Sequence, residues 1–276
     1  MTERALVLGG GGITGIAWEL GVIAGLAELG VDLTGADVVV GTSAGSVVGA
    51  QIATGVDVEE RYQAQLAPPT GEIAASIGPA TMLRLGLAMI GPPSPQRIRA
   101  RIGRMAARTA STPESDRIAV IGARLPKHEW PDRALRITAV DARTGAFTVF
   151  DRTSDVPLVS AVAASCAVPG VWPPVTIGAH RYIDGGVRSP ANVDLARDCD
   201  RVVVLAPIAR GMGGGTAVAA QARRLRGRVA VVTPDAAAVT AIGRNVLDPA
   251  RRAAAARAGR AQAKAALAQV QAVWEE

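Results

Sequence analysis

Two short apolar runs, each followed by a glycine-containing turn and a helix-compatible segment, occupy the first fifty residues. The apolar run at residues 5–8 is followed by four glycines, and residues 16–29 then carry apolar side chains at helical spacing. Residues 38–40 run into a second such turn before residues 47–54. Parallel strands are joined by crossovers of a dozen or more residues, usually a helix, so two such units in succession predict an α/β fold.

Later segments extend this pattern. Residues 202–205 and 229–232 are β-branched apolar runs typical of buried strands. Residues 134–140 and 147–150 flank a turn and predict a β-hairpin, and residues 157–167 predict a short helix.

At 276 residues and 28.2 kDa, the chain has the size of many single-domain α/β proteins, so we predict one domain over residues 1–276. Asp248 followed by Pro249 predicts the start of a long terminal helix over residues 248–274. From Arg210 onward the chain carries no motif that assigns a function.

Prolines and arginines set residues 67–113 apart, and we interpret this segment as a lid-like insertion. Its apolar residues could cover the site and dock on anionic bilayers, or simply pack on the sheet. These residues are Met82, Leu83, Leu85, Leu87, Met89 and Ile90.

Composition excludes several classes of protein. With 49% apolar and 20% charged residues, the chain is too apolar to be disordered. The net charge of +6 suits anionic lipid or nucleic acid, but aromatic residues make up 3% and no basic run is interleaved with them. We therefore expect no nucleic-acid partner, and peripheral contact with an anionic membrane stays open.

The sequence also indicates a compartment. The N-terminus lacks the features of a secretory signal, and no apolar stretch is long enough to span a membrane. Cys166 and Cys199 form neither a disulfide framework nor a metal-binding spacing. We expect a cytoplasmic, metal-free protein that binds the inner face of a membrane at most peripherally.

The second turn, residues 41–45, reads Gly-Thr-Ser-Ala-Gly and fits G-x-S-x-G. This motif holds a serine at a sharp strand-to-helix turn with its hydroxyl accessible, which makes Ser43 a candidate nucleophile. The N–H of Ala44 would point into an oxyanion site at the helix N-terminus. Gly41 and Gly45 fit the turn because side chains there would collide.

The first turn, residues 9–15, supplies consecutive N–H groups that can converge on an oxyanion. It also fits the dinucleotide pattern G-x-G-x-x-G at Gly10, Gly12 and Gly15. That alternative expects an acid at the end of the second strand, whereas Asp32 and Asp37 precede it, so nucleotide binding is disfavoured.

A nucleophilic serine needs a base, and the chain has only His128 and His180. An α/β-hydrolase places its histidine last, but no histidine follows residue 180. Asp184 lies at the end of a predicted short strand, residues 181–183, and precedes two glycines. A carboxylate there can accept the serine proton if burial keeps its pKa high enough, although an ordinary Asp-Gly turn is the alternative.

Together these motifs resemble those of the patatin-like phospholipases. The resemblance rests on residues 10–15, 41–45 and 184–186, with a similar small-residue, proline-containing segment at residues 164–174. It implies a three-layer α/β/α fold with a mainly parallel sheet, and hydrolysis of lipid or phospholipid esters through an acyl-enzyme without metal or cofactor. The implied roles are a Ser43/Asp184 dyad, an oxyanion hole of Gly10, Gly11, Gly12 and Ala44, and supporting glycines Gly15, Gly41, Gly45, Gly185 and Gly186.

One residue departs from the family pattern: Thr14 stands where the family often has Arg or Lys. This departure puts the arrangement of the oxyanion loop and a preference for phosphate-bearing substrates in doubt. An acyltransferase or thioesterase with the same dyad is the first alternative, and a nucleotide-binding or non-catalytic scaffold is the second. Acyl-chain length, head group and oligomeric state are not predicted.

Overall fold

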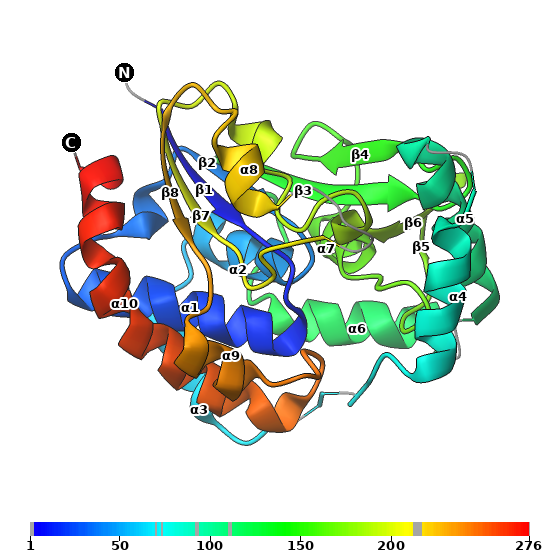
Figure 1. Cartoon of the computed structure of the whole chain (residues 1–276), viewed down its shortest axis with the longest axis horizontal. Helices are drawn as coiled ribbons and strands as arrows, with labels where there is room; N and C mark the ends of the chain where they lie inside the picture. The colour runs from blue at the N-terminus through cyan, green and yellow to red at the C-terminus, as the bar shows by residue number, and fades with distance from the viewer. Residues whose placement is uncertain are drawn as a thin grey trace.

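The computed structural model describes residues 3–69, 71–72, 74–91, 94–109, 112–211 and 217–275. Its eight strands form one sheet in the order β5-β6-β3-β2-β1-β7-β8, with β4 paired to β3 (Figure 1). β1, β2, β3, β7 and β8 run parallel to one another; β4 and β6 pair antiparallel with β3, and β5 pairs antiparallel with β6. The strands are β1 (Arg4–Leu8), β2 (Val38–Gly41), β3 (Ala134–Asp141), β4 (Phe147–Phe150), β5 (Val175–Ile177), β6 (His180–Asp184), β7 (Arg201–Leu205) and β8 (Arg228–Val232).

Helices connect and cover these strands. The α-helices are α1 (Gly12–Glu28), α2 (Ala44–Ala53), α3 (Val58–Leu66), α4 (Pro79–Met89), α5 (Pro95–Thr109), α6 (Glu114–Arg124), α7 (Leu158–Ser165), α8 (Val218–Ala222), α9 (Ala236–Ile242) and α10 (Arg252–Trp274). Short 3-10 turns include η2 (Gly185–Val187) and η3 (Val193–Ala196).

The sheet is buried on both faces, as its β-branched strands predict. Along β7, Val203 and Leu205 pack into the core under α1, α2, α7 and α10, whereas Val202 and Val204 pack under η3 and α8. This alternation gives helix, sheet and helix layers and confirms the predicted three-layer α/β/α fold (Figure 1).

The terminal helix α10 lies along α1, the helix that begins at the first glycine turn (Figure 1). A Cβ at Gly21 would lie 2.2 Å from the carbonyl oxygen of Ala256, and one at Gly259 would lie 2.3 Å from that of Trp18. The two helix backbones therefore touch. The last third of the chain, which carries no motif, covers the helix that leads out of the predicted oxyanion loop.

Segment 67–113 contributes α4 and α5, and residues 70, 73, 92–93 and 110–111 of it lie outside the described residues. α5 rests on the end of the sheet, because a Cβ at Gly103 would lie 2.0 Å from the carbonyl oxygen of Ala142. Leu85 is 3% exposed and Met89 packs beside it, so for these two residues the core alternative holds. The single domain and the lid-like role of this segment stay predictions.

Candidate active site

Strand pairing on β3 brings the two predicted catalytic residues together. Gly41, the last residue of β2, pairs with Ile137, and Asp184, the last residue of β6, pairs with Ala139. β4 occupies the opposite edge of β3 at both positions, so β2 and β6 share one edge and approach each other end to end. Ser43 lies two residues beyond the end of β2 and within hydrogen-bond reach of Asp184.

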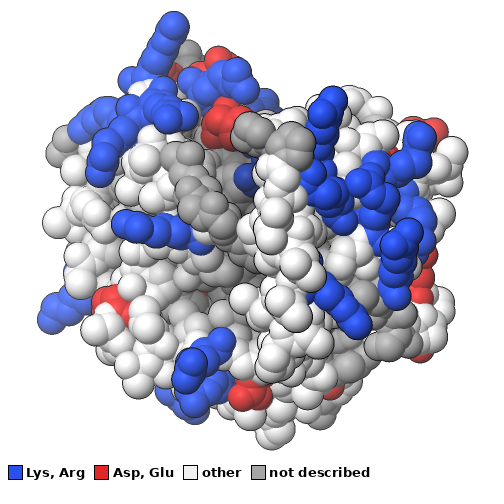
Figure 2. Space-filling model, turned by 45° about the vertical axis from the view of Figure 1, so that its right-hand side comes forward, with Lys and Arg blue, Asp and Glu red and all other residues white. Residues whose placement is uncertain are grey.

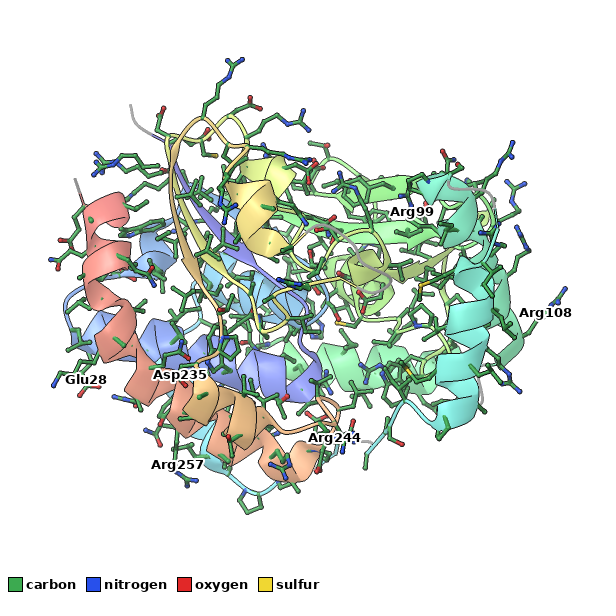
Figure 3. The ribbon with its side chains drawn as sticks, viewed as in Figure 1. Glu28, Arg99, Arg108, Asp235, Arg244 and Arg257 are labelled. Carbon is green, nitrogen blue, oxygen red and sulfur yellow. The ribbon has the colours of Figure 1, made fainter. Side chains whose placement is uncertain are left out.

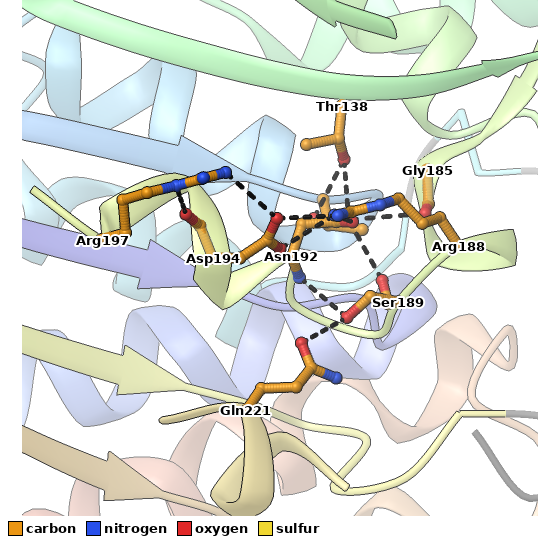
Figure 4. A network of polar contacts seen from close by, with 9 residues as sticks. Thr138, Gly185, Arg188, Ser189, Asn192, Asp194, Arg197 and Gln221 are labelled. Atoms are coloured by element: carbon orange, nitrogen blue, oxygen red, sulfur yellow. Dashed lines mark hydrogen bonds and ion pairs between the residues drawn. The ribbon is translucent and has the colours of Figure 1, made fainter. Parts of the chain in front are cut away.

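A buried hydrogen-bond network joins these two strand ends (Figure 4). The Asn192 amide donates to the hydroxyls of Thr42 at 3.0 Å and Thr138 at 3.3 Å, and to the Gly185 carbonyl at 3.4 Å. Asn192 is fully buried and has a left-handed backbone (φ 48°, ψ 44°), which asparagine tolerates better than most residues. The Arg188 guanidinium in turn donates to the Asn192 side-chain oxygen at 2.7 Å. Sequence patterns gave no indication of Asn192.

Ser43 sits in the strained turn that its motif predicts, with φ 53° and ψ −115°. Its N–H donates to the Ser165 hydroxyl at 2.9 Å, and its carbonyl accepts from the Ser46 hydroxyl at 2.7 Å and the Cys166 thiol at 3.3 Å. A non-glycine residue in such a conformation costs on the order of 1–3 kcal/mol and persists only when its surroundings fix it. Side chains from α2 and the end of α7 therefore fix the backbone of Ser43.

The supporting glycines allow close backbone approaches around this turn. A Cβ at Gly45 would lie 2.2 Å from the Leu8 carbonyl oxygen, and one at Gly185 would lie 2.2 Å from the Thr138 hydroxyl. Substitution at either position would force the strand ends apart. Added Cβ atoms at the other supporting glycines would also meet neighbours within 3.4 Å; these glycines are Gly15, Gly41 and Gly186.

Asp184 has the environment of a base rather than of an exposed turn. Its side chain is buried, with 5% of the residue exposed, and burial raises its pKa from 3.8 to about 6. Hydrogen bonds from the Ser43 hydroxyl and from the Gly186 N–H, at 2.7 Å, and the positive charge of Arg117 hold the pKa from rising further. The carboxylate is therefore ionised at neutral pH while it holds the serine hydroxyl.

The predicted oxyanion residues differ in what their N–H groups do. The Gly10 N–H donates to the Pro190 carbonyl at 2.7 Å, although Gly10 itself lies against Ser43. Within the described ranges, no acceptor pairs with the N–H groups of Gly11, Gly12 or Ala44. These three groups are the ones available to an incoming oxyanion.

Thr14, the position that departs from the family pattern, takes part in fixing the loop rather than in binding. Its N–H and its hydroxyl both lie 3.2 Å from the Val246 carbonyl oxygen and donate to it. A Cβ at Gly12, where φ is +61°, would lie 2.5 Å from the same oxygen. The first glycine turn therefore packs against Val246, in the segment that precedes α10.

Ser43, Asp184 and the first glycine turn line an apolar pocket of about 160 Å³. Its apolar lining residues are Ile77, Val168, Pro169, Val187, Pro190, Ile208, Val246 and Leu247. Such a pocket suits a hydrocarbon chain more than a charged substrate. Neither histidine lines it: His128 is bonded to the Gly122 carbonyl, and His180 lies 2.8 Å from Asp141. No cluster of three or more metal-ligating side chains occurs in the part of the chain described.

Comparison with known proteins decides the family. The sequence profile of the patatin-like phospholipases matches residues 6–197, which is more than half of the chain. The chain belongs to this family. Membership confirms the family that the motifs resemble and the class of enzyme they imply, a lipid ester hydrolase. No curated protein sequence matches the chain.

A solved structure with a TM-score above 0.5 agrees on the fold. VipD from Legionella pneumophila is 14% identical with a TM-score of 0.51, over 97% of this chain and 67% of VipD. The type III effector ExoU is 19% identical with a TM-score of 0.43, over 100% of this chain and 54% of ExoU. ExoU in complex with SpcU from Pseudomonas aeruginosa is 16% identical with a TM-score of 0.42, over 100% and 53%. The chain therefore spans about two thirds of VipD and about half of ExoU.

Proposed function

We propose that this protein hydrolyses acyl esters of lipids, with Ser43 as nucleophile and Asp184 as general base. The observation that carries the proposal is the hydrogen bond from the Ser43 hydroxyl to a buried carboxylate whose pKa is about 6. A base with a pKa just below neutral is ionised, yet basic enough to accept a proton in the transition state. The apolar pocket beside both side chains supplies room for the acyl chain.

The proposed reaction has two halves. Ser43 Oγ attacks the ester carbonyl carbon while Asp184 takes its proton, and the carbonyl oxygen becomes an oxyanion that the N–H groups of Gly11, Gly12 and Ala44 can bind. Collapse breaks the ester bond, and Asp184 returns the proton to the departing alcohol. Water then attacks the acyl-enzyme with Asp184 as base, which releases the fatty acid and restores Ser43.

Ser43→Ala tests the nucleophile. We expect turnover of p-nitrophenyl esters to fall at least about 10³-fold, and labelling by a fluorophosphonate probe to vanish, because only the nucleophilic oxygen is removed. Ser115→Ala, at an exposed position on α6, is the matched control and should label like wild type. Substantial labelling of folded Ser43→Ala protein would refute the nucleophile.

Asp184→Asn, with the two histidines as comparison, tests the base. The amide keeps the shape of the side chain but cannot accept the serine proton, so activity should fall nearly as far as in Ser43→Ala. His128→Ala and His180→Ala should retain activity. Equal damage from either histidine change, with folding preserved, would replace the dyad by a histidine triad.

We also propose that α4 and α5 dock this enzyme on an anionic bilayer. The exposed fractions of Leu83, Leu87 and Ile90 at α4 are 66%, 59% and 69%. Between Glu72 and Glu114 the sequence has no acidic residue and six arginines. Figure 2 turns this end of the molecule toward the viewer, and basic side chains far outnumber acidic ones there. An apolar ridge beside cations is complementary to anionic lipid.

The α4–α5 surface adjoins the active site. Ile77, just before α4, lines the apolar pocket. Gly170, which follows the lining residue Pro169, packs against α4, because a Cβ there would lie 2.5 Å from Thr81. A lipid lifted from a bilayer at α4 would therefore have a short path to Ser43. None of the described helices is both long and apolar enough to cross a membrane, and surface contact is the mode of binding that we propose.

A further inference from the structure

Arg117 on α6 is a buried cation that forms no direct ion pair with any described residue. It is 4% exposed, and its guanidinium lies 4.2 Å from the centre of the Trp172 ring. Within the described residues no carboxylate lies at ion-pair distance, and its buried Nε has no hydrogen-bond acceptor. The nearby carboxylate of Glu72 pairs with Arg124 and Arg252 instead.

The place where Arg117 is buried gives it chemical significance. A second small cavity of about 20 Å³ adjoins the nucleophile, and Arg117 lines it together with Gly12, Ser43, Ala44 and Trp172. A volume of this size holds one water-sized group. Gly12 and Ala44, two of the residues whose N–H groups are available to an oxyanion, therefore line the same hollow as Arg117.

An unpaired buried charge is costly, on the order of several kcal/mol even after relaxation of the protein. Burial lowers the pKa of Arg117 to about 10, so the side chain remains protonated at neutral pH. The cost is offset whenever an anionic oxygen enters the hollow. In the proposed reaction the anionic oxygen that forms beside Ser43 is the former carbonyl oxygen of the ester.

We propose that Arg117 is a further catalytic residue, whose guanidinium stabilises the oxyanion of the tetrahedral intermediates together with the N–H groups of Gly12 and Ala44. This role rests on the proposed ester hydrolysis. Arg117 donates hydrogen bonds and transfers no proton: the carbonyl π electrons move to oxygen as Ser43 bonds to carbon, and Asp184 takes the serine proton. The Trp172 ring fixes the plane of the guanidinium.

Arg117→Gln removes the charge and leaves a shorter polar side chain. With p-nitrophenyl butyrate, we expect kcat to fall about 10²- to 10³-fold, the usual effect of losing one oxyanion donor, with KM changed only a few-fold. Arg117→Lys keeps the charge without the planar fork and should lose less. Arg152→Gln removes an exposed arginine as the matched control. Thermal unfolding checks each fold, and if Arg117→Gln does not fold, a tenfold loss of kcat in folded Arg117→Lys carries the test.

Two measurements separate this role from others. If Arg117 acted only by lowering the pKa of Asp184, the activity of Arg117→Gln would recover to wild-type level at pH 9, which would overturn the proposal. If it bound a lipid phosphate, loss would occur on phosphatidylglycerol vesicles but not on the uncharged ester, and that result would overturn the proposal as well. A loss that persists at pH 9, where Asp184 is ionised in both proteins, and that occurs on both substrates supports it. An inactive wild type would sink both proposals, whereas an active wild type and an equally active Arg117→Gln variant would sink this one alone.

Discussion

Asp184 is held where its charged form is disfavoured, although the proposed reaction needs that form. Raising its pKa from 3.8 to about 6 corresponds to roughly 3 kcal/mol of free energy against ionisation in the folded protein. The hydrogen bonds from Ser43 and Gly186 recover only part of the lost solvation. Burial of Asp184 therefore lowers the stability of the fold at neutral pH and raises the basicity of the carboxylate beside Ser43.

This exchange predicts opposite effects of Asp184→Asn on activity and stability. Because the native carboxyl keeps its proton to a higher pH than the unfolded one, its contribution to stability is greatest below pH 3.8 and falls as pH rises toward 6. The amide avoids that loss, so the variant should be more stable than wild type at pH 8, by at most about 3 kcal/mol, and similar near pH 3.5.

Urea unfolding at the two pH values measures the stability difference, and wild-type kcat/KM should rise with pH through an apparent pKa near 6. The two proteins differ only at residue 184, so the pH dependence of the difference belongs to its carboxyl group. A less stable Asp184→Asn protein at pH 8 would mean that the Ser43 and Gly186 hydrogen bonds outweigh the desolvation of the carboxylate.

At the residue scale, the sequence predicted the residues that stand in a motif and missed the residues that fix their position by hydrogen bonds. Ser43 and Asp184 stand in short patterns whose chemistry is local. Asn192 and Ser165 act on the turn from 150 and 122 positions away, and such pairings leave no local pattern. Arg117 shows the same limit, because a lone arginine in an amphipathic helix looks like any solvated charge until its burial is known.

At the scale of elements, patterns of apolar residues predicted most strands and the terminal helix but not their partners. The existence of α10 follows from its alanine-rich sequence and the Asp248 cap. Its contact with α1 depends on glycines in both helices that sequence periodicity treats only as weak positions. The helix α6 and the short strand β5 were not predicted, and α6 carries Arg117.

Because α1 and α10 are in backbone contact, we expect one added methyl group at this contact to lower the stability of the protein strongly. Gly259→Ala would place its Cβ 2.3 Å from the Trp18 carbonyl oxygen, so the helices must separate, and we expect a loss of about 2–4 kcal/mol. Gly86→Ala on α4 meets nothing within 4 Å and replaces glycine by a better helix former, so stability should stay equal or rise by up to about 1 kcal/mol.

Chemical denaturation of both variants measures these changes. Because α1 begins at the proposed oxyanion loop, Gly259→Ala should also lower esterase activity in the folded fraction. Equal stability of the two variants would mean that α10 can shift along α1 without cost.

At the scale of the whole molecule, α4 and α5 combine exposed apolar side chains with arginines at one end. Arg108 extends from the end of α5 into solvent (Figure 3), whereas Arg99 turns inward and donates to the Gly145 carbonyl at 2.8 Å. The sequence shows that segment 67–113 is rich in apolar residues and arginines, but it does not show which of these side chains face solvent. Leu83 and Leu87 face solvent, while Leu85 lies in the core between them.

A double substitution on α4 tests the proposed membrane surface. Leu83→Ser with Leu87→Ser removes two exposed apolar side chains and leaves Leu85 and the arginines in place. Binding to phosphatidylglycerol vesicles should weaken roughly tenfold or more, since each leucine loses over 1 kcal/mol of burial in lipid. Turnover of a soluble short-chain ester should be retained. Val239→Ser on α9, 58% exposed at wild type, is the matched control and should change neither.

Salt dependence tests the electrostatic half of the same surface. Raising ionic strength from about 0.15 to about 0.5 M shortens the screening length from about 8 Å to roughly half that, so vesicle binding should weaken while hydrolysis of the soluble ester stays constant. Vesicle sedimentation and esterase assays on the same samples separate the two effects. If the double variant loses both activities together and unfolds at a lower temperature, α4 is part of the core and the bilayer must be met by another face.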